Sequence, residues 1–179
     1  RPCAPTSRGS GRVLSGLDLL SAVTPRGGYR VERGVRYGER PEQLLDIYRP
    51  AEPRAGARPI LFFHGGSWSS GRRGEYRFVG QAFASAGYVV AIPDYRVYPT
   101  VVFPAFVEDG ARAVAWALGA LSSKGDSPVL VGHSAGAHIA ALLALDRRYL
   151  EAAGVAADRV DTVVGLSGPY DFLPLTKPL

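Results

Sequence analysis

The pentapeptide Gly132-His133-Ser134-Ala135-Gly136 has residue types and spacing that suit nucleophilic catalysis. The apolar residues 128–131 before it are typical of a short buried strand, and the run 139–145 after it has the composition of a helix. In a G-x-S-x-G sequence between a strand and a helix, the serine lies on a sharp turn that exposes its hydroxyl. Glycines two residues to either side let the strand and the helix pass close together. We therefore predict Ser134 to be a nucleophile, with an ordinary tight turn as the alternative.

A second candidate group, His64-Gly65-Gly66-Ser67-Trp68, directly follows the apolar run 60–63. Two glycines after a strand allow the backbone to turn its amides toward an open cleft, where they can stabilise a tetrahedral oxyanion. Together with the serine motif, this loop predicts an oxyanion hole made of the Gly65, Gly66 and Ala135 amides. The supporting residues of the two motifs are His64, Trp68, Gly132, His133 and Gly136. Taken alone, the loop is equally consistent with a tight turn that contains a structural histidine.

The elements that must position these motifs follow from the spacing of apolar residues. Strands are predicted over residues 29–37, 44–48, 60–63, 88–92, 128–131 and 162–166, and helices over 76–86, 103–121 and 135–150. Strands that alternate with helices of this length predict a parallel sheet covered on both faces. The first two strands are joined by a Gly-Glu-Arg-Pro turn, which predicts a hairpin at one edge of the sheet.

Several side chains near the motifs are interpreted as structural. Asp94, which follows the fourth predicted strand, is expected to hydrogen-bond a loop beneath the oxyanion turn. Glu108 and Asp109 are expected on the solvated face of their helix. Trp68 either lines a substrate pocket or packs in the core, and packing is the preferred interpretation.

The length of 179 residues is sufficient for one domain with a hydrophobic core. Residues 1–28 are rich in Arg, Ser, Gly and Pro, and they predict an N-terminal arm or a short leading helix. Residues 29–179 show no repeat and no linker, so they are predicted to form a single domain.

Composition excludes several classes of function. The formal net charge is +5, but the basic residues are scattered, so a solvated surface is favoured over nucleic-acid binding. The single cysteine, Cys3, excludes an intrachain disulfide and a cysteine-rich zinc site. We expect neither a metal nor an organic cofactor. Apolar runs are shorter than the roughly 18 residues of a membrane span, which predicts a soluble protein.

With both motifs in place, residues 29–179 resemble the α/β-hydrolase fold, and within it the esterases and lipases with an HGG oxyanion motif, the hormone-sensitive-lipase-like group. HGGSW followed by GHSAGAH is also similar to small carboxylesterases, feruloyl-esterase-like proteins and kynurenine formamidases. Asp94-Tyr95-Arg96 and the SGPYD sequence at 167–171 are similar to stretches at the same places in those proteins. The resemblance implies a doubly wound, mostly parallel sheet with an N-terminal hairpin.

The resemblance also implies a catalytic triad in the chain order Ser, Asp or Glu, then His. The three histidines, His64, His133 and His138, all precede or flank Ser134, so we expect none of them to be the general base. Asp171 follows the last predicted strand and is a candidate acid in a variant arrangement, although a turn or cap is the preferred role. We therefore expect a partial domain that lacks the last strands, the triad acid and the triad histidine, and that is inactive by itself.

The function implied is hydrolysis of small-molecule carboxylic esters through an acyl-enzyme on Ser134. Amide hydrolysis of the arylformamidase type is the nearest alternative, because the same two motifs serve both reactions. A non-catalytic binding protein of the same fold is the alternative from a different class, because the triad histidine is missing. For localisation, the sequence leaves open the cytoplasm and export with a lipid anchor on Cys3.

Overall fold

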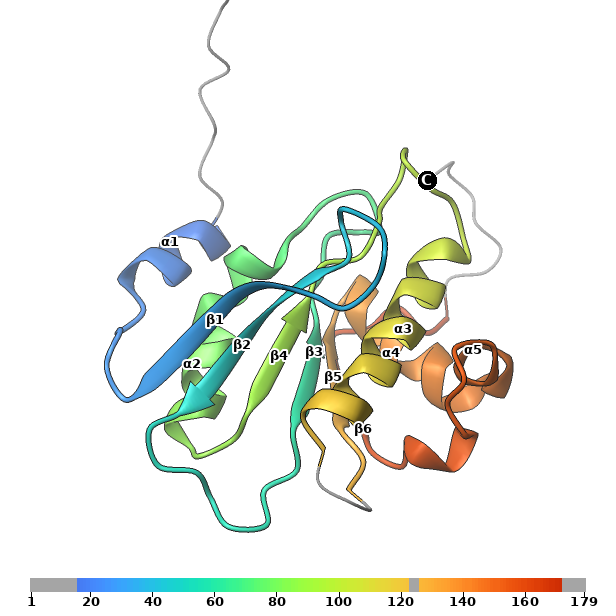
Figure 1. The fold of residues 1–179 in the computed structure, drawn as a ribbon. Helices are drawn as coiled ribbons and strands as arrows, with labels where there is room; N and C mark the ends of the chain where they lie inside the picture. The colour runs from blue at the N-terminus through green and yellow to red at the C-terminus, as the bar shows by residue number, and fades with distance from the viewer. Residues whose placement is uncertain (1–15, 123–125, 172–179) are drawn as a thin grey trace, which may run out of the picture.

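The computed structural model describes residues 16–122 and 126–171, and Cys3 lies outside them. In this part of the chain, six strands form one sheet in the order β1-β2-β4-β3-β5-β6 (Figure 1). The strands are β1 Tyr29–Arg36, β2 Leu44–Pro50, β3 Ile60–Phe63, β4 Val90–Pro93, β5 Val129–His133 and β6 Val163–Leu166. Strands β4, β3, β5 and β6 run parallel, whereas β1 and β2 form an antiparallel hairpin whose β2 pairs with β4. The predicted doubly wound, mostly parallel sheet with an N-terminal hairpin is confirmed.

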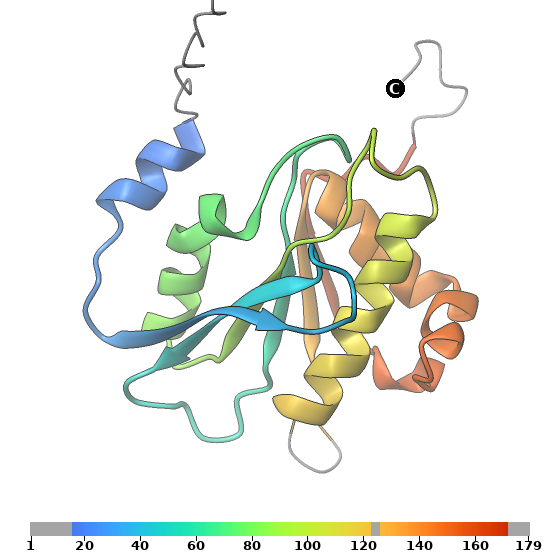
Figure 2. The same ribbon diagram turned by 45° about the horizontal axis from the view of Figure 1, so that its top comes forward.

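Helices cover both faces of the sheet (Figures 1 and 2). On one face lie α1 Gly16–Val23, the 3-10 helix η1 Arg73–Tyr76 and α2 Arg77–Ser85. On the other lie α3 Ala105–Ala120, α4 Ala135–Leu145 and α5 Arg147–Ala152, and the short 3-10 helix η2 Ala157–Arg159 follows α5. The side chain of Ser21 in α1 donates a hydrogen bond to the carbonyl of Glu75 in η1, at 2.6 Å. Helix α1 therefore packs on the same layer as α2.

Strand β3 is the centre of the core. Its four residues are buried, and they alternate between the two faces of the sheet as a strand requires. Ile60 and Phe62 pack with the cluster beneath α2, while Leu61 and Phe63 pack with the cluster beneath α3 and α4. This arrangement explains why the run is continuously apolar, because neither face of the strand meets water.

The predicted helix 135–150 is two helices, which corrects the sequence interpretation. Helix α4 ends at Leu145, and Asp146 has an extended backbone with φ −110° and ψ 96°. The Asp146 side chain accepts a hydrogen bond from the Arg148 N–H at 3.2 Å. Aspartate favours such N-cap positions, because its carboxylate satisfies an amide that the first helical turn leaves unpaired. The cap therefore starts α5 in a new direction.

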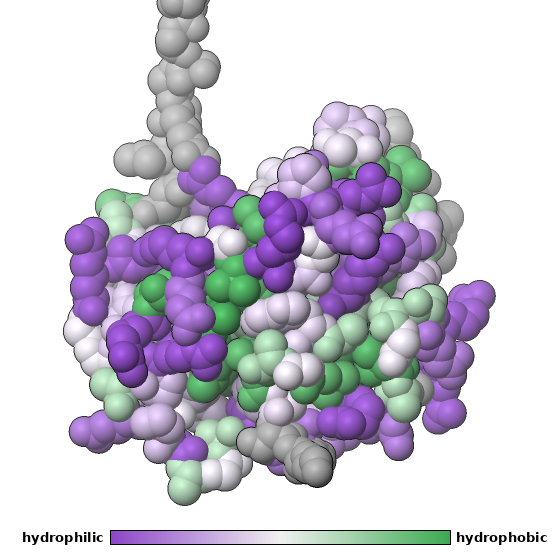
Figure 3. Space-filling model, viewed as in Figure 1, coloured by the Kyte–Doolittle hydropathy of each residue, from purple (hydrophilic) through white to green (hydrophobic). Residues whose placement is uncertain are grey.

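The face of Figure 3 carries hydrophilic residues over most of its area, with small groups of hydrophobic residues between them. None of the helices in the two described ranges has the length and hydropathy that a bilayer crossing requires.

Candidate active site

Ser134 occupies the turn between β5 and α4, with φ 51° and ψ −118°. A positive φ is unfavourable for any residue with a Cβ, and such strain costs about 1–3 kcal/mol. Hydrogen bonds hold the turn on both sides. The Ser134 N–H donates to the carbonyl of Leu166 in β6 at 2.8 Å, and the Ser134 carbonyl accepts from Ala137 and His138 at 3.0 and 3.2 Å. The structure thus gives this serine the strained strand-to-helix turn that the motif predicts.

Both glycines of the serine motif lie where a side chain would collide with backbone. A Cβ on Gly132 would overlap the carbonyl of Gly136, the second residue of α4. A Cβ on Gly136 would overlap the carbonyl of Phe63, the last residue of β3. These two glycines therefore let β5, α4 and the end of β3 meet closely, as the sequence predicts.

His64 is completely buried at the end of β3. Its ring stacks on Tyr95, with centroids 4.3 Å apart and an interplanar angle of 12°. Its Nδ1 lies 2.8 Å from the Gly65 carbonyl, and its Nε2 lies 3.7 Å from a carboxylate oxygen of Asp94. Burial lowers the pKa of the His64 imidazole below its ordinary value, because a charged ring is poorly solvated there. His64 is placed as a neutral packing residue of the loop.

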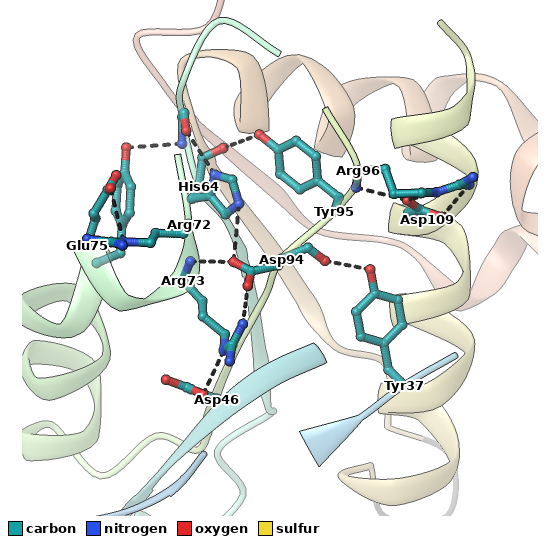
Figure 4. Close-up of polar contacts among 12 residues, drawn as sticks. Tyr37, Asp46, His64, Arg72, Arg73, Glu75, Asp94, Tyr95, Arg96 and Asp109 are labelled. Atoms are coloured by element: carbon teal, nitrogen blue, oxygen red, sulfur yellow. Dashed lines mark hydrogen bonds and ion pairs between the residues drawn. The ribbon is translucent and has the colours of Figure 1, made fainter. Parts of the chain in front are cut away.

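Asp94 connects this loop to the sheet (Figure 4). Its carboxylate accepts the backbone N–H of Arg73 at 2.6 Å and pairs with the Arg73 guanidinium. That guanidinium also donates to Asp46 in β2 at 2.8 Å. The Asp94 carbonyl accepts the Tyr37 hydroxyl at 2.5 Å. Asp94 thus hydrogen-bonds the loop that follows the HGGSW sequence, in keeping with the structural role predicted for it.

The Gly65 amide has a different role from the one that the sequence predicts. Its N–H donates to the hydroxyl of Tyr76 at 3.0 Å, and the same hydroxyl lies 2.8 Å from Nδ1 of His133. An N–H group that is paired inside the protein is not free for an oxyanion, so the expectation for Gly65 is corrected. Gly66, with φ 136°, is next to it; a Cβ there would overlap the Ser70 carbonyl.

The remaining predicted residues are placed as follows. The ring of His138 packs edge-on against Trp68, with centroids 5.3 Å apart, and partial burial lowers the pKa of this histidine. Asp171 is exposed beyond β6. Among the described residues, Nδ1 of His64 lies at the Gly65 carbonyl and Nδ1 of His133 at the Tyr76 hydroxyl, rather than at Ser134 or Asp171. Residues 16–122 and 126–171 contain no cluster of three or more His, Cys, Asp or Glu side chains that could hold a metal ion.

An apolar cavity of about 470 Å³ lies beside the HGGSW loop. Its lining comes from the HGGSW loop and from the segment before α3: Ser67, Trp68, Ser69, Tyr98, Val101, Val102, Phe103 and Phe106. Trp68 also packs against the core and lies 6.3 Å from Phe106, ring centroid to ring centroid. Trp68 therefore both packs and lines a pocket, the two roles that the sequence presented as alternatives.

Sequence reasoning missed two buried tyrosines that hydrogen-bond the backbone of the HGG loop. The Tyr76 hydroxyl accepts from the Gly65 amide, and the Tyr95 hydroxyl donates to the His64 carbonyl. Tyr76 belongs to no motif, and the resemblance of the Asp94-Tyr95-Arg96 stretch did not indicate this role for Tyr95. The expectation of a solvated Asp109 is wrong. This carboxylate is buried and accepts two hydrogen bonds from the Arg96 guanidinium at 2.8 Å each and one from Gln43 at 2.7 Å. Only Glu108 is exposed.

The sequence matches the BD-FAE family over residues 45–178. The rice protein "Probable isoprenylcysteine alpha-carbonyl methylesterase ICMEL1" (Oryza sativa subsp. japonica) is 36% identical over 155 residues, which cover 82% of this chain and 36% of the rice protein. The crystal structure of esterase B from Lactobacillus rhamnosis matches with a TM-score of 0.69 and 27% identity, covering 85% of this chain and 53% of that one.

An esterase from the bacterial hormone-sensitive lipase family matches with a TM-score of 0.66 and 26% identity, covering 87% of this chain and 49% of that one. The chain thus spans about a third of the rice relative's length and about half of each solved esterase. The family match includes both the HGGSW loop and the serine motif. The chain therefore belongs to the BD-FAE family, within the hormone-sensitive-lipase-like group of α/β-hydrolase carboxylesterases.

Proposed function

We propose that this protein hydrolyses carboxylic esters through an acyl-enzyme on Ser134. The observation that carries the proposal is the strained turn of Ser134, with φ 51°, beside the HGG loop. The two motifs are far apart in sequence but adjacent in space, since a Cβ on Gly65 would lie 2.7 Å from Nδ1 of His133. A serine hydroxyl next to backbone amides is the arrangement that acyl transfer needs.

In the proposed reaction, the Ser134 oxygen attacks the ester carbonyl carbon and its proton passes to a general base. The negative charge on the carbonyl oxygen is stabilised by the amides of Gly66 and Ala135, and the N-terminus of α4 adds its positive dipole end. Collapse of the intermediate expels the alcohol and leaves an acyl group on Ser134. Water then attacks this ester and releases the acid.

The general base in this proposal is none of His64, His133 and His138. His64 is buried against Tyr95, His133 is bonded to Tyr76, and His138 packs on Trp68. The same observation supports the second candidate, a non-catalytic binding protein of this fold. The two candidates differ in whether Ser134 becomes acylated.

For the substrate, we propose a small ester with an apolar group. The apolar cavity beside Gly66 supports this choice, because it is lined largely by aromatic and aliphatic side chains. The rice relative is named for a methylesterase of isoprenylcysteine, which contains such a group. Arylformamides are the alternative substrates, since amide hydrolysis would use the same nucleophile and amides.

Labelling with a fluorophosphonate, followed by mass spectrometry of the tryptic peptide, tests the proposal directly. In the whole protein, with its general base present, we expect an adduct on Ser134 and hydrolysis of p-nitrophenyl esters faster than that of N-formylkynurenine. Both label and hydrolysis should be absent from the Ser134→Ala variant and retained in Ser85→Ala, which alters an exposed serine at the end of α2, outside both motifs. A folded protein that takes up no label would favour the binding protein instead.

A further inference from the structure

The Tyr76 hydroxyl joins the loop after β3 to the turn after β5. Tyr76 is the last residue of η1, and 2% of it is exposed. Its oxygen lies 3.0 Å from the Gly65 nitrogen and 2.8 Å from Nδ1 of His133. Gly65 immediately precedes Gly66, and His133 immediately precedes Ser134. The Tyr76 hydroxyl thus contacts the residue before the proposed oxyanion donor Gly66 and the residue before the proposed nucleophile Ser134.

Donor chemistry fixes the direction of one of these hydrogen bonds. A backbone amide can only donate, so the Tyr76 oxygen accepts from Gly65. The Tyr76 hydroxyl donates to Nδ1 of His133 in the ring tautomer that carries its proton on Nε2, and accepts from Nδ1 in the other tautomer. Burial raises the pKa of the Tyr76 hydroxyl, so it keeps this proton. In either tautomer the Tyr76 oxygen bridges Gly65 and His133, and in the Nε2–H tautomer the two bonds form a chain in which each polarises the next.

Packing fixes where this hydroxyl lies. The Tyr76 ring contacts Phe62 of β3 and Phe78 of α2, with centroid distances of 5.3 and 5.9 Å. On the other side, the Gly65 nitrogen already lies at hydrogen-bond distance, 3.0 Å, from the Tyr76 oxygen. The packing of η1 and α2 on the sheet therefore helps to set the position of the hydroxyl, and His64 of the loop stacks on the same ring, with centroids 6.2 Å apart.

We propose that Tyr76 is a positioning residue that sets the separation between the Gly66 amide and Ser134. The inference rests on the proposed function, because this separation matters only if an oxyanion forms between the two. An oxyanion donor must lie about 2.7–3.1 Å from the developing charge, and misplacement by about 1 Å can cost up to about 100-fold in rate. Without the hydroxyl, the loop and the turn would lose their common hydrogen-bond partner.

The Tyr76→Phe variant tests this inference. It keeps the ring and removes only the bridging hydroxyl. We expect kcat for a p-nitrophenyl ester to fall by about 10- to 100-fold while KM stays within about twofold, because the contact affects the transition state more than substrate binding. The matched control is Tyr48→Phe, in the same core cluster, whose buried hydroxyl has no hydrogen-bond partner among the described residues. Its kcat should be unchanged.

Substitutions of His133 separate positioning from general packing. His133→Gln supplies a carbonyl oxygen that can accept from Tyr76, whereas His133→Leu supplies no acceptor. We expect His133→Gln to retain most of kcat, and His133→Leu to lose about as much as Tyr76→Phe. The double variant of Tyr76→Phe with His133→Leu should be no slower than either single variant, since all three break the same bridge.

Hydrogen exchange gives a readout that does not depend on catalysis. Tyr76→Phe should speed exchange in the loop 64–71 and in the turn 131–138, and Tyr48→Phe should not. If the wild-type protein shows Ser134-dependent hydrolysis but Tyr76→Phe keeps full kcat and the same exchange, the inference is wrong and the proposed function stands. If the wild-type protein hydrolyses nothing, the proposed function fails, and unchanged exchange in Tyr76→Phe would then also reject the bridge.

Discussion

The Tyr95 hydroxyl donates to the carbonyl of His64 at 2.7 Å, while the two rings stack with their centroids 4.3 Å apart. Tyr95 thus holds the loop before Gly65 through both its ring and its hydroxyl. Tyr95→Phe keeps the stack and leaves the buried carbonyl without this donor. We expect a loss of about 1–2 kcal/mol in the free energy of unfolding. Urea denaturation measures it, and an unchanged midpoint would show that the carbonyl finds another donor.

Gly136→Ala should prevent the close packing of α4 against the end of β3. The added Cβ would overlap the carbonyls of Phe63 and His64, which are backbone atoms that cannot turn away. We expect a loss of about 3 kcal/mol or more in the free energy of unfolding. The control is Gly119→Ala in α3, where a Cβ meets nothing within 4 Å, and which should stabilise the protein by about 0.5 kcal/mol. Equal midpoints for the two variants in thermal denaturation would contradict this account.

Neighbouring carboxylates in α3 should differ sharply in their effect on stability. Asp109→Asn leaves the Arg96 guanidinium without its buried counter-charge, so we expect a loss of about 3 kcal/mol. Glu108→Gln changes an exposed residue and should alter stability by less than about 0.5 kcal/mol. Chemical denaturation of both variants checks the contrast. Similar losses would mean that the Arg96 pair contributes little.

Stability should fall as the pH drops through the ordinary pKa of histidine. The pKa of buried His64 is lowered in the folded protein from the usual 6.5, so below that pH the unfolded chain binds more protons. Protons therefore favour unfolding, by up to about 1.4 kcal/mol per pH unit for this group. Denaturation at pH 7.5 and pH 5.5 measures the loss, which should be smaller in His64→Gln. Equal slopes for the variant and the wild type would assign the pH dependence to other groups.

The apolar cavity should select the substrate. Val102 lies at its rim and is 68% exposed, so Val102→Asp should fold normally and place a charge in the pocket. We expect KM for p-nitrophenyl octanoate to rise about tenfold and KM for the acetate to stay unchanged, since only a long chain reaches the cavity. Leu145→Asp, at an 83% exposed apolar residue that ends α4, is the control. A parallel rise for both esters would exclude a role in chain selection.

The sequence predicted well those parts of the fold that depend on residues close together in the chain. The run 60–63 is apolar at every residue because both faces of β3 are buried, and so it was identified as a central strand. The serine motif predicted its turn because the contact that requires Gly132, with the Gly136 carbonyl, lies within the motif itself. By contrast, the Ala- and Leu-rich composition around Asp146 favours helix throughout, and only the side-chain cap shows the break.

The parts that were missed depend on partners distant in sequence. Asp109 is buried because Gln43 and Arg96 reach it from other segments, and nothing in its own helix indicates this. The Gly65 amide likewise has its partner in Tyr76, whose position depends on the packing of η1. Motif reasoning therefore located the site but could not show which of its amides was already paired.

The hydrogen bond from the Ser134 N–H to the Leu166 carbonyl has a consequence for biosynthesis. Parallel pairing of β5 with β6 ends at His133 opposite Leu166, so the last contact of this ladder is also the one that holds the turn. A nascent chain in which residue 166 has not yet left the ribosome cannot make it. Ser134 can therefore gain this hydrogen bond to its strained turn only after β6 has emerged and docked on β5.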